Sequence, residues 1–116
     1  VFSLRHKSTV AEVVPDAGCN LLSLRVDGVE YLRVPEQLER LRGVAFGTPI
    51  LYPSPNRVRG ARFRFQGQEI RFSPNNGENF IHGLLHSAAW QVRDSGSAQD
   101  QAWLQAETSI DAQRTE

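Results

Sequence analysis

Residues 62–72 read Arg-Phe-Arg-Phe-Gln-Gly-Gln-Glu-Ile-Arg-Phe, and this stretch decides the class of fold. Apolar and charged residues alternate over residues 62–65 and again over 69–72, which is the period of a strand with one half-buried face. Gln66-Gly67-Gln68 supplies a turn between the two segments. The stretch therefore predicts a β-hairpin whose arginine side chains face solvent.

Upstream of this hairpin the chain continues as short strands separated by turn residues. Residues 9–14 are rich in β-branched side chains and end at Pro15, and residues 21–26 alternate apolar with polar. Asp27-Gly28 is a strong hairpin-turn dipeptide, so residues 29–32 are expected to return as the partner strand.

Downstream, strands are predicted over residues 89–93 and 103–110, with a polar loop of small residues over 95–101. The one plausible helical stretch is 35–42, which Gly43 would end after a turn or two. The pattern predicts an all-β fold of antiparallel strands, and no domain boundary is visible within residues 1–116.

Composition narrows the functional classes. The chain has 116 residues with 13 Lys+Arg and 13 Asp+Glu, so a formal net charge of zero gives no electrostatic argument for nucleic acid or for an anionic membrane. No apolar stretch approaches the roughly 20 residues that span a bilayer. The single cysteine, Cys19, cannot form an internal disulfide or a thiolate metal site, and it fits a reducing, cytoplasmic location.

Both ends of the chain suggest a fragment of a longer fold. The sequence starts at Val1 and contains no methionine. Its last residues, 108–116, begin like a strand and stop without a turn or a cap. We therefore expect the 116 residues to be the N-terminal part of one larger domain.

The first candidate site is Asn56-Arg57. These residues come directly after the segment Thr-Pro-Ile-Leu-Tyr-Pro-Ser-Pro at positions 48–55, whose prolines stiffen the backbone and fix the direction in which Asn56-Arg57 leaves it. A guanidinium presents five donors in a fixed fork, which suits sugar hydroxyls and a ring oxygen. The alternative is that Asn56 caps a turn and Arg57 forms a surface salt bridge.

The second candidate is His82, which lies between two apolar segments. Gly83 directly after it permits a close backbone approach or an unusual backbone angle. An imidazole can donate to or accept from a sugar oxygen near neutral pH, although a lone histidine beside apolar residues is often structural. His86 could pair with His82 at a metal only on a helix, and no helical pattern or third ligand is visible, so no metal site is predicted.

Taken together and in order, these motifs resemble the aldose 1-epimerase family, also called galactose mutarotases. The resemblance covers nearly the whole chain. It rests on Val13-Val14-Pro15-Asp16-Ala17-Gly18, Leu21-Leu22-Ser23-Leu24, residues 27–32, residues 47–58, Gly60-Ala61-Arg62-Phe63, Phe65-Gln66-Gly67, Asn76, Ile81-His82-Gly83-Leu84 and Trp90.

The resemblance implies a galactose mutarotase-like β-supersandwich and an isomerase that interconverts the α and β anomers of a free aldose, a small-molecule sugar, without a cofactor. A base takes the proton of the anomeric hydroxyl and an acid protonates the ring oxygen, so that the ring opens and recloses on the other face.

The resemblance also assigns roles to the candidate residues. Arg57 corresponds to a position that hydrogen-bonds the sugar, with Asn56 in the same pocket. His82 corresponds to a catalytic position beside the ring that binds the sugar and polarises the ring oxygen. The family's principal acid, a histidine, and its base, a glutamate, lie further along the chain, and residues 1–116 show no motif for either. The fragment is therefore expected to be inactive alone.

Three matters stay open at this point. A non-catalytic carbohydrate-binding or sugar-sensing module with the same fold is the alternative function. Residues 52–55, Tyr-Pro-Ser-Pro, depart from the run before Asn-Arg in the galactose enzymes and in the hexose-6-phosphate mutarotases, which leaves the identity of the sugar undecided. The oligomeric state is not indicated.

Overall fold

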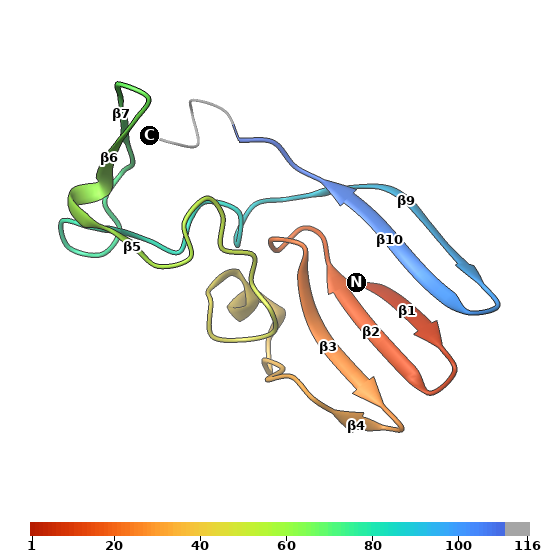
Figure 1. The fold of residues 1–116 in the computed structure, drawn as a ribbon. Coiled ribbons are helices and arrows are strands. Elements are labelled where there is room, and N and C mark those ends of the chain that lie inside the picture. Colours follow the sequence, from red (N-terminus) through yellow and green to blue (C-terminus); the bar gives the residue numbers. More distant parts are fainter. Residues whose placement is uncertain (111–116) are drawn as a thin grey trace. The chain divides into compact units, whose positions relative to one another are not determined.

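The computed structural model describes residues 1–110, apart from the side chain of Arg42, and it divides the chain into two compact units (Figure 1). The first unit contains Val1–Ile50 and His86–Thr108, and the second contains Leu51–Leu85 together with Ser109 and Ile110. Antiparallel strands and two short 3₁₀ helices make up the regular structure of the described part, which confirms the all-β prediction. Within residues 1–110, no helix has the length and hydropathy that crossing a membrane requires.

Four strands of the first unit form one antiparallel sheet in the order β1-β2-β3-β4 (Figure 1). The strands are β1 (Phe2–His6), β2 (Thr9–Val14), β3 (Asn20–Val26) and β4 (Val29–Glu30). The predicted strand over 9–14 is confirmed, and the one over 21–26 starts a residue earlier. β4 is shorter than the predicted 29–32 because the Glu30 carboxylate accepts the backbone N–H groups of Leu24 and Leu32, so a side chain replaces ladder bonds there.

The hairpin of β9 (Gln91–Ala98) and β10 (Gln101–Glu107) also belongs to the first unit and lies beside β1 (Figure 1). The predicted loop over 95–101 is wrong, since most of it is strand and only residues 99–100 turn. The predicted strands over 89–93 and 103–110 are shifted for the same reason. Gly96 lies directly opposite Trp103, and the Trp103 ring covers the space that a side chain at Gly96 would fill. A small residue is therefore needed within this strand.

The core of the first unit is formed by Ala17, Leu22, Leu41 and Phe46, with Val14 packed against it. Leu41 comes from the 3₁₀ helix η1 (Leu38–Arg42), so the predicted short helix is confirmed over the second half of residues 35–42. The guanidinium groups of Arg33 and Arg40 lie 4.8 and 5.0 Å from the centroid of the Phe46 ring. Both distances are within the range of cation–π contacts.

In the second unit, β5 (Arg57–Val58) pairs with β8 (Phe80–Ile81), and β6 (Arg62–Phe65) pairs with β7 (Gln68–Arg71). The β6–β7 pair is the hairpin predicted from the alternating stretch, and its turn is Gln66-Gly67 with φ of 50° and 77°. A short 3₁₀ helix, η2 (Arg59–Ala61), connects β5 to this hairpin. The Phe72 and Phe80 rings stack with centroids 4.3 Å apart and form the core together with Ala61.

Candidate functional site

Asn56-Arg57 and His82 lie together in the second unit although they are far apart in the sequence. Arg57 pairs with Ile81 across β5 and β8. One residue beyond this pair, the backbone N–H of His82 donates a hydrogen bond to the carbonyl oxygen of Asn56 at 3.4 Å. The strand pairing thus brings the two predicted sites into one, with their backbones in direct contact.

The proline-rich segment packs its backbone against the residues after His82. The Leu84 N–H donates to the carbonyl oxygen of Tyr52 at 2.7 Å. Gly83 has φ of 72°, and a β-carbon there would overlap the Tyr52 carbonyl group. The expected close approach at Gly83 is therefore confirmed. Position 83 requires glycine because φ is positive and because there is no space for a β-carbon.

His82 itself has a left-handed backbone with φ of 68°. This conformation is uncommon for a residue with a side chain, and it persists only where the surrounding contacts impose it. Here the imposing contacts are the β5–β8 pairing before His82 and the Tyr52–Leu84 hydrogen bond after it. Nothing in the local sequence signalled this angle, and the His82 side chain is half-buried.

Arg57 is exposed, and its guanidinium is held by a neutral partner. Its Nε donates to the side-chain oxygen of Asn76 at 2.9 Å, while its backbone N–H donates to the Asn56 side-chain oxygen at 2.9 Å. The alternative salt bridge does not form, since no carboxylate within residues 1–110 pairs with Arg57. No described carboxylate therefore compensates the Arg57 guanidinium, and most of its donors remain available.

The chemistry available in the second unit is that of binding and polarising a polar ligand. Within residues 51–85, His82 is the one imidazole, and the carboxylates are Glu69 and Glu78. Glu69 accepts from Arg71 Nε at 2.5 Å, so it is already paired. Throughout the part of the chain that the structure describes, no three His, Cys, Asp or Glu side chains gather closely enough to hold a metal ion.

Two groups with shifted pKa values lie in the first unit, not beside His82. The Ser23 hydroxyl, the backbone N–H groups of Leu24 and Leu32, and the nearby Arg25 lower the pKa of the Glu30 carboxyl, against the desolvation that opposes them. Partial burial raises the pKa of the Cys19 thiol. The Glu30 network closes the end of β4, so its role is structural.

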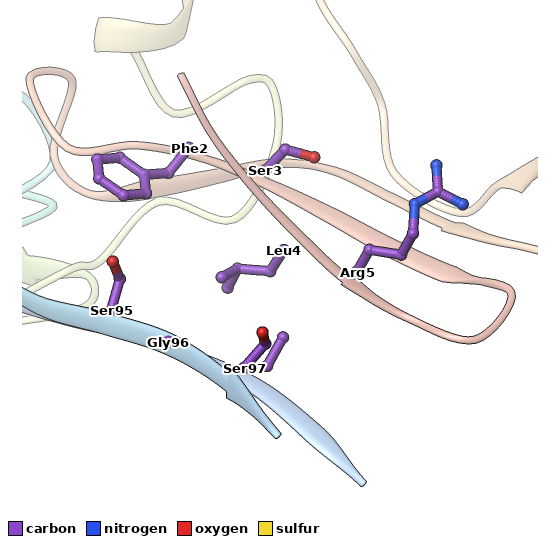
Figure 2. Close-up of a pocket in the computed structure, with 8 residues that line it drawn as sticks. Phe2, Ser3, Leu4, Arg5, Ser95, Gly96 and Ser97 are labelled. Carbon is purple, nitrogen blue, oxygen red and sulfur yellow. The ribbon is translucent and has the colours of Figure 1, made fainter. Parts of the chain in front are cut away.

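A cavity of about 350 Å³ lies between β1 and the β9–β10 hairpin in the first unit (Figure 2). Phe2 and Leu4 point toward the hairpin, whereas Ser3 and Arg5 project from the opposite face of β1, as the strand period requires (Figure 2). The cavity is lined by Phe2, Ser3, Leu4, Arg5, Ser95, Gly96, Ser97 and Ala102. Because this lining contains no imidazole and no carboxylate, the cavity lacks the groups that move protons in acid–base catalysis.

The chain is similar in sequence to known proteins. In the sequence comparison, residues 1–114 match the model of the family described as aldose 1-epimerase. The uncharacterized protein YihR of Escherichia coli K12 is 33% identical over 79 residues, which are 66% of this chain and 25% of YihR.

Solved structures agree with the fold. A galactose mutarotase-like protein from Clostridium acetobutylicum superposes with a TM-score of 0.78 at 30% identity, over 85% of this chain and 32% of that protein. A galactose 1-epimerase from Lactobacillus acidophilus superposes with a TM-score of 0.69 over 86% of this chain and 31% of the enzyme, and at 20% identity it supports the fold alone.

The chain is much shorter than these relatives. It spans between a quarter and a third of the length of the three proteins. The family match nevertheless extends over residues 1–114, almost the full sequence, and includes the segments that carry Asn56, Arg57 and His82. On this evidence the chain belongs to the aldose 1-epimerase family.

Proposed function

We propose that the complete gene product, the protein translated from the whole reading frame that contains these 116 residues, is an aldose 1-epimerase acting on a free aldose. The observation that carries the proposal is the meeting of Asn56-Arg57 with His82 across the β5–β8 pair. A cation with free donors beside an imidazole on a rigid backbone suits an oxygen-rich neutral ligand.

In this proposal the two sites have different roles. Arg57 donates to sugar oxygens, and the Asn56 amide, whose oxygen already accepts the Arg57 N–H, offers its NH₂ group to the same ligand. His82 binds beside the ring and polarises the ring oxygen. Residues 51–85 hold one imidazole, and their two carboxylates are Glu69, which is paired with Arg71, and Glu78, which is exposed. In this proposal neither carboxylate is the base, and the principal acid and base come from elsewhere in the complete protein.

Mutarotation of a panel of hexoses and pentoses, followed by polarimetry from the pure α anomers, tests the proposal. The complete gene product should equilibrate at least one sugar faster than buffer, and Arg57→Ala should lower kcat/KM by about 10- to 100-fold, the effect of a lost charged hydrogen bond. Arg59→Ala, which removes an exposed arginine two residues away, is the matched control and should retain activity. An unchanged kcat/KM in Arg57→Ala would remove the site from the reaction.

The 116-residue chain alone should not catalyse mutarotation. A rate above the buffer background that His82→Ala abolishes would contradict this. Reading the coding DNA beyond codon 116 gives an independent check, because an acid histidine and a base glutamate should lie further on in strand-rich sequence. If both are missing, and the protein binds sugars through Arg57 without turnover, the non-catalytic sugar-binding module is the correct function.

The proposal also includes a cytoplasmic setting, since a single, half-buried Cys19 thiol requires no oxidising compartment. The sugar panel decides the substrate, because residues 52–55 depart from the runs before Asn-Arg in the galactose enzymes and in the hexose-6-phosphate mutarotases.

A further inference from the structure

The loop between β7 and β8 makes contacts that the proposed reaction does not yet explain. Three asparagine side chains in it each bond to a different segment around the site. Asn76 accepts from Arg57 Nε at 2.9 Å, and Asn79 accepts from the Gly60 N–H at 3.0 Å. Asn75 makes two bonds with the backbone of Ile81: it accepts from the N–H at 2.7 Å and donates to the carbonyl oxygen at 3.1 Å.

The loop is also closed on itself. The backbone N–H groups of Asn75 and Asn76 both donate to the carbonyl oxygen of Asn79, and the Asn79 N–H returns a bond to the Asn76 carbonyl, all at 3.0 Å. Gly77 at the tip has φ of 62°, as a tight turn of this kind requires. Asn76 is half-buried. The hydrogen bonds within the loop hold its backbone in place.

The partner of Arg57 differs in kind from the carboxylates that pair with three other arginines. Arg25 lies 2.7 Å from Glu12, Arg71 lies 2.5 Å from Glu69, and Arg93 lies 2.5 Å from Glu107. A carboxylate would neutralise the guanidinium and compete with a ligand for its donors. An amide oxygen instead fixes the direction of the guanidinium through Nε alone and leaves the two terminal NH₂ groups, with four N–H donors, unoccupied by the described residues.

We propose that Asn76 is a positioning residue that orients the Arg57 guanidinium for the ligand without reducing its charge. The neighbouring Asn75 ties the same loop to Ile81, the residue before His82, so one rigid loop sets the positions of both site residues. This inference rests on the proposed function, because it takes Arg57 as the group that binds the sugar.

Arginine-selective ¹⁵N NMR tests the hydrogen bond without any need for activity. The Arg57 Nε–H proton should exchange slowly with solvent in the parent protein and fast in Asn76→Ala. Asn79→Ala, in the same loop but bonded to Gly60, is the matched control and should leave the Arg57 signal protected. An Arg57 Nε–H that exchanges equally fast in the parent and in Asn76→Ala would overturn the inference.

A double-mutant cycle on the complete gene product tests the consequence. Asn76→Ala should lower kcat/KM for mutarotation by about tenfold in the parent, as expected for an arginine that has lost its orientation. When Arg57→Ala is already present, Asn76→Ala should lower kcat/KM no further. Asn79→Ala should lower kcat/KM by the same factor with and without Arg57→Ala. If Asn76→Ala does not fold, Asn76→Asp keeps the acceptor and the turn, and its Arg57 Nε–H should stay protected.

The outcomes separate the two proposals. Arg57→Ala without effect on turnover or on sugar binding would overturn the proposed function. If Arg57→Ala lowers kcat/KM but Asn76→Ala lowers it by the same factor with and without Arg57→Ala, only the role of Asn76 is overturned.

Discussion

The backbone N–H of His82 donates to the carbonyl oxygen of Asn56 at 3.4 Å, immediately beyond the pairing of Arg57 with Ile81. This bond holds His82 in a left-handed conformation at φ of 68°. The contact between the two backbones therefore comes with an uncommon backbone angle at His82. The cost of this angle can be measured by substitution at position 82.

Replacing His82 by alanine or by glycine should affect activity and stability differently. Both variants remove the imidazole, which in the proposed reaction polarises the ring oxygen of the sugar. Both should therefore lower kcat/KM of the complete gene product by about 100-fold or more. Glycine tolerates the left-handed backbone, so His82→Gly should be more stable than His82→Ala by about 1 kcal/mol. Urea unfolding of the two variants checks the order, and an alanine variant as stable as the glycine variant would show that position 82 is not strained.

Gly83→Ala should be far more damaging than Gly67→Ala, although both glycines have positive φ. At Gly67, φ is 77° and nothing lies within 4 Å of an added β-carbon, whereas at Gly83 the added atom overlaps the Tyr52 carbonyl group. Gly67→Ala should therefore lower the free energy of unfolding by about 1 kcal/mol from the backbone angle alone.

Gly83→Ala adds a clash that only backbone movement can relieve, so its loss should exceed about 3 kcal/mol or prevent folding. Thermal unfolding and the yield of soluble protein measure both variants. Equal losses at the two positions would mean that the contact between Gly83 and Tyr52 does not constrain the site.

Sequence reasoning succeeded where structure depends on local periodicity. The alternation over residues 62–72 gave the β6–β7 hairpin to within one residue, because the strand period is visible in the side chains themselves. It failed at residues 95–101, where Ser95-Gly96-Ser97 has the composition of a loop. These residues pair with β10, and the Trp103 ring occupies the space over Gly96. The composition of the segment does not show this pairing.

The same distinction applies to the candidate site. Arg57 and His82 could be singled out because rigid or apolar neighbours surround them in the sequence. The hydrogen bond from Arg57 to Asn76 and the backbone angle of His82 could not be predicted, since both depend on how the β7–β8 loop and the proline-rich segment meet in space. A polar loop rich in asparagine indicates only a turn until its partners are known.

Asn20 should be among the most sensitive polar positions of the first unit. It is fully buried, its side-chain oxygen accepts from the Thr48 N–H at 2.9 Å, and its NH₂ group donates to the Phe46 carbonyl at 3.4 Å. Asn20→Leu keeps the volume but leaves both backbone groups without partners, so the free energy of unfolding should fall by about 2–4 kcal/mol.

The control for Asn20 is Gln105→Leu, which makes a comparable polar-to-apolar change at an exposed position of β10. It should change the free energy of unfolding by less than about 0.5 kcal/mol. Urea unfolding of both variants gives the comparison. A small loss in Asn20→Leu would mean that the segment around Gly47 is not held to β3 by this side chain.

Stability should depend on pH through Glu30, whose carboxylate accepts from the Ser23 hydroxyl and from the backbone N–H groups of Leu24 and Leu32. These donors lower the pKa of Glu30 in the folded state, so the folded protein binds this proton less readily than the unfolded chain. The contribution to stability is therefore fully present above the ordinary glutamate pKa of about 4.3. It is lost as the pH falls from there through the lowered value.

Glu30→Gln should accordingly be less stable than the parent at pH 7, and the difference should shrink as the pH is lowered to 3. Glu36→Gln removes an exposed carboxylate that has no hydrogen bond or ion pair among the described residues, so it controls for net charge. Urea unfolding of the three proteins at both pH values measures the effect. A Glu30→Gln deficit of the same size at pH 3 and pH 7 would show that protonating Glu30 in the parent does not weaken the network. The end of β4 would then depend on the geometry of the Glu30 side chain and not on its charge.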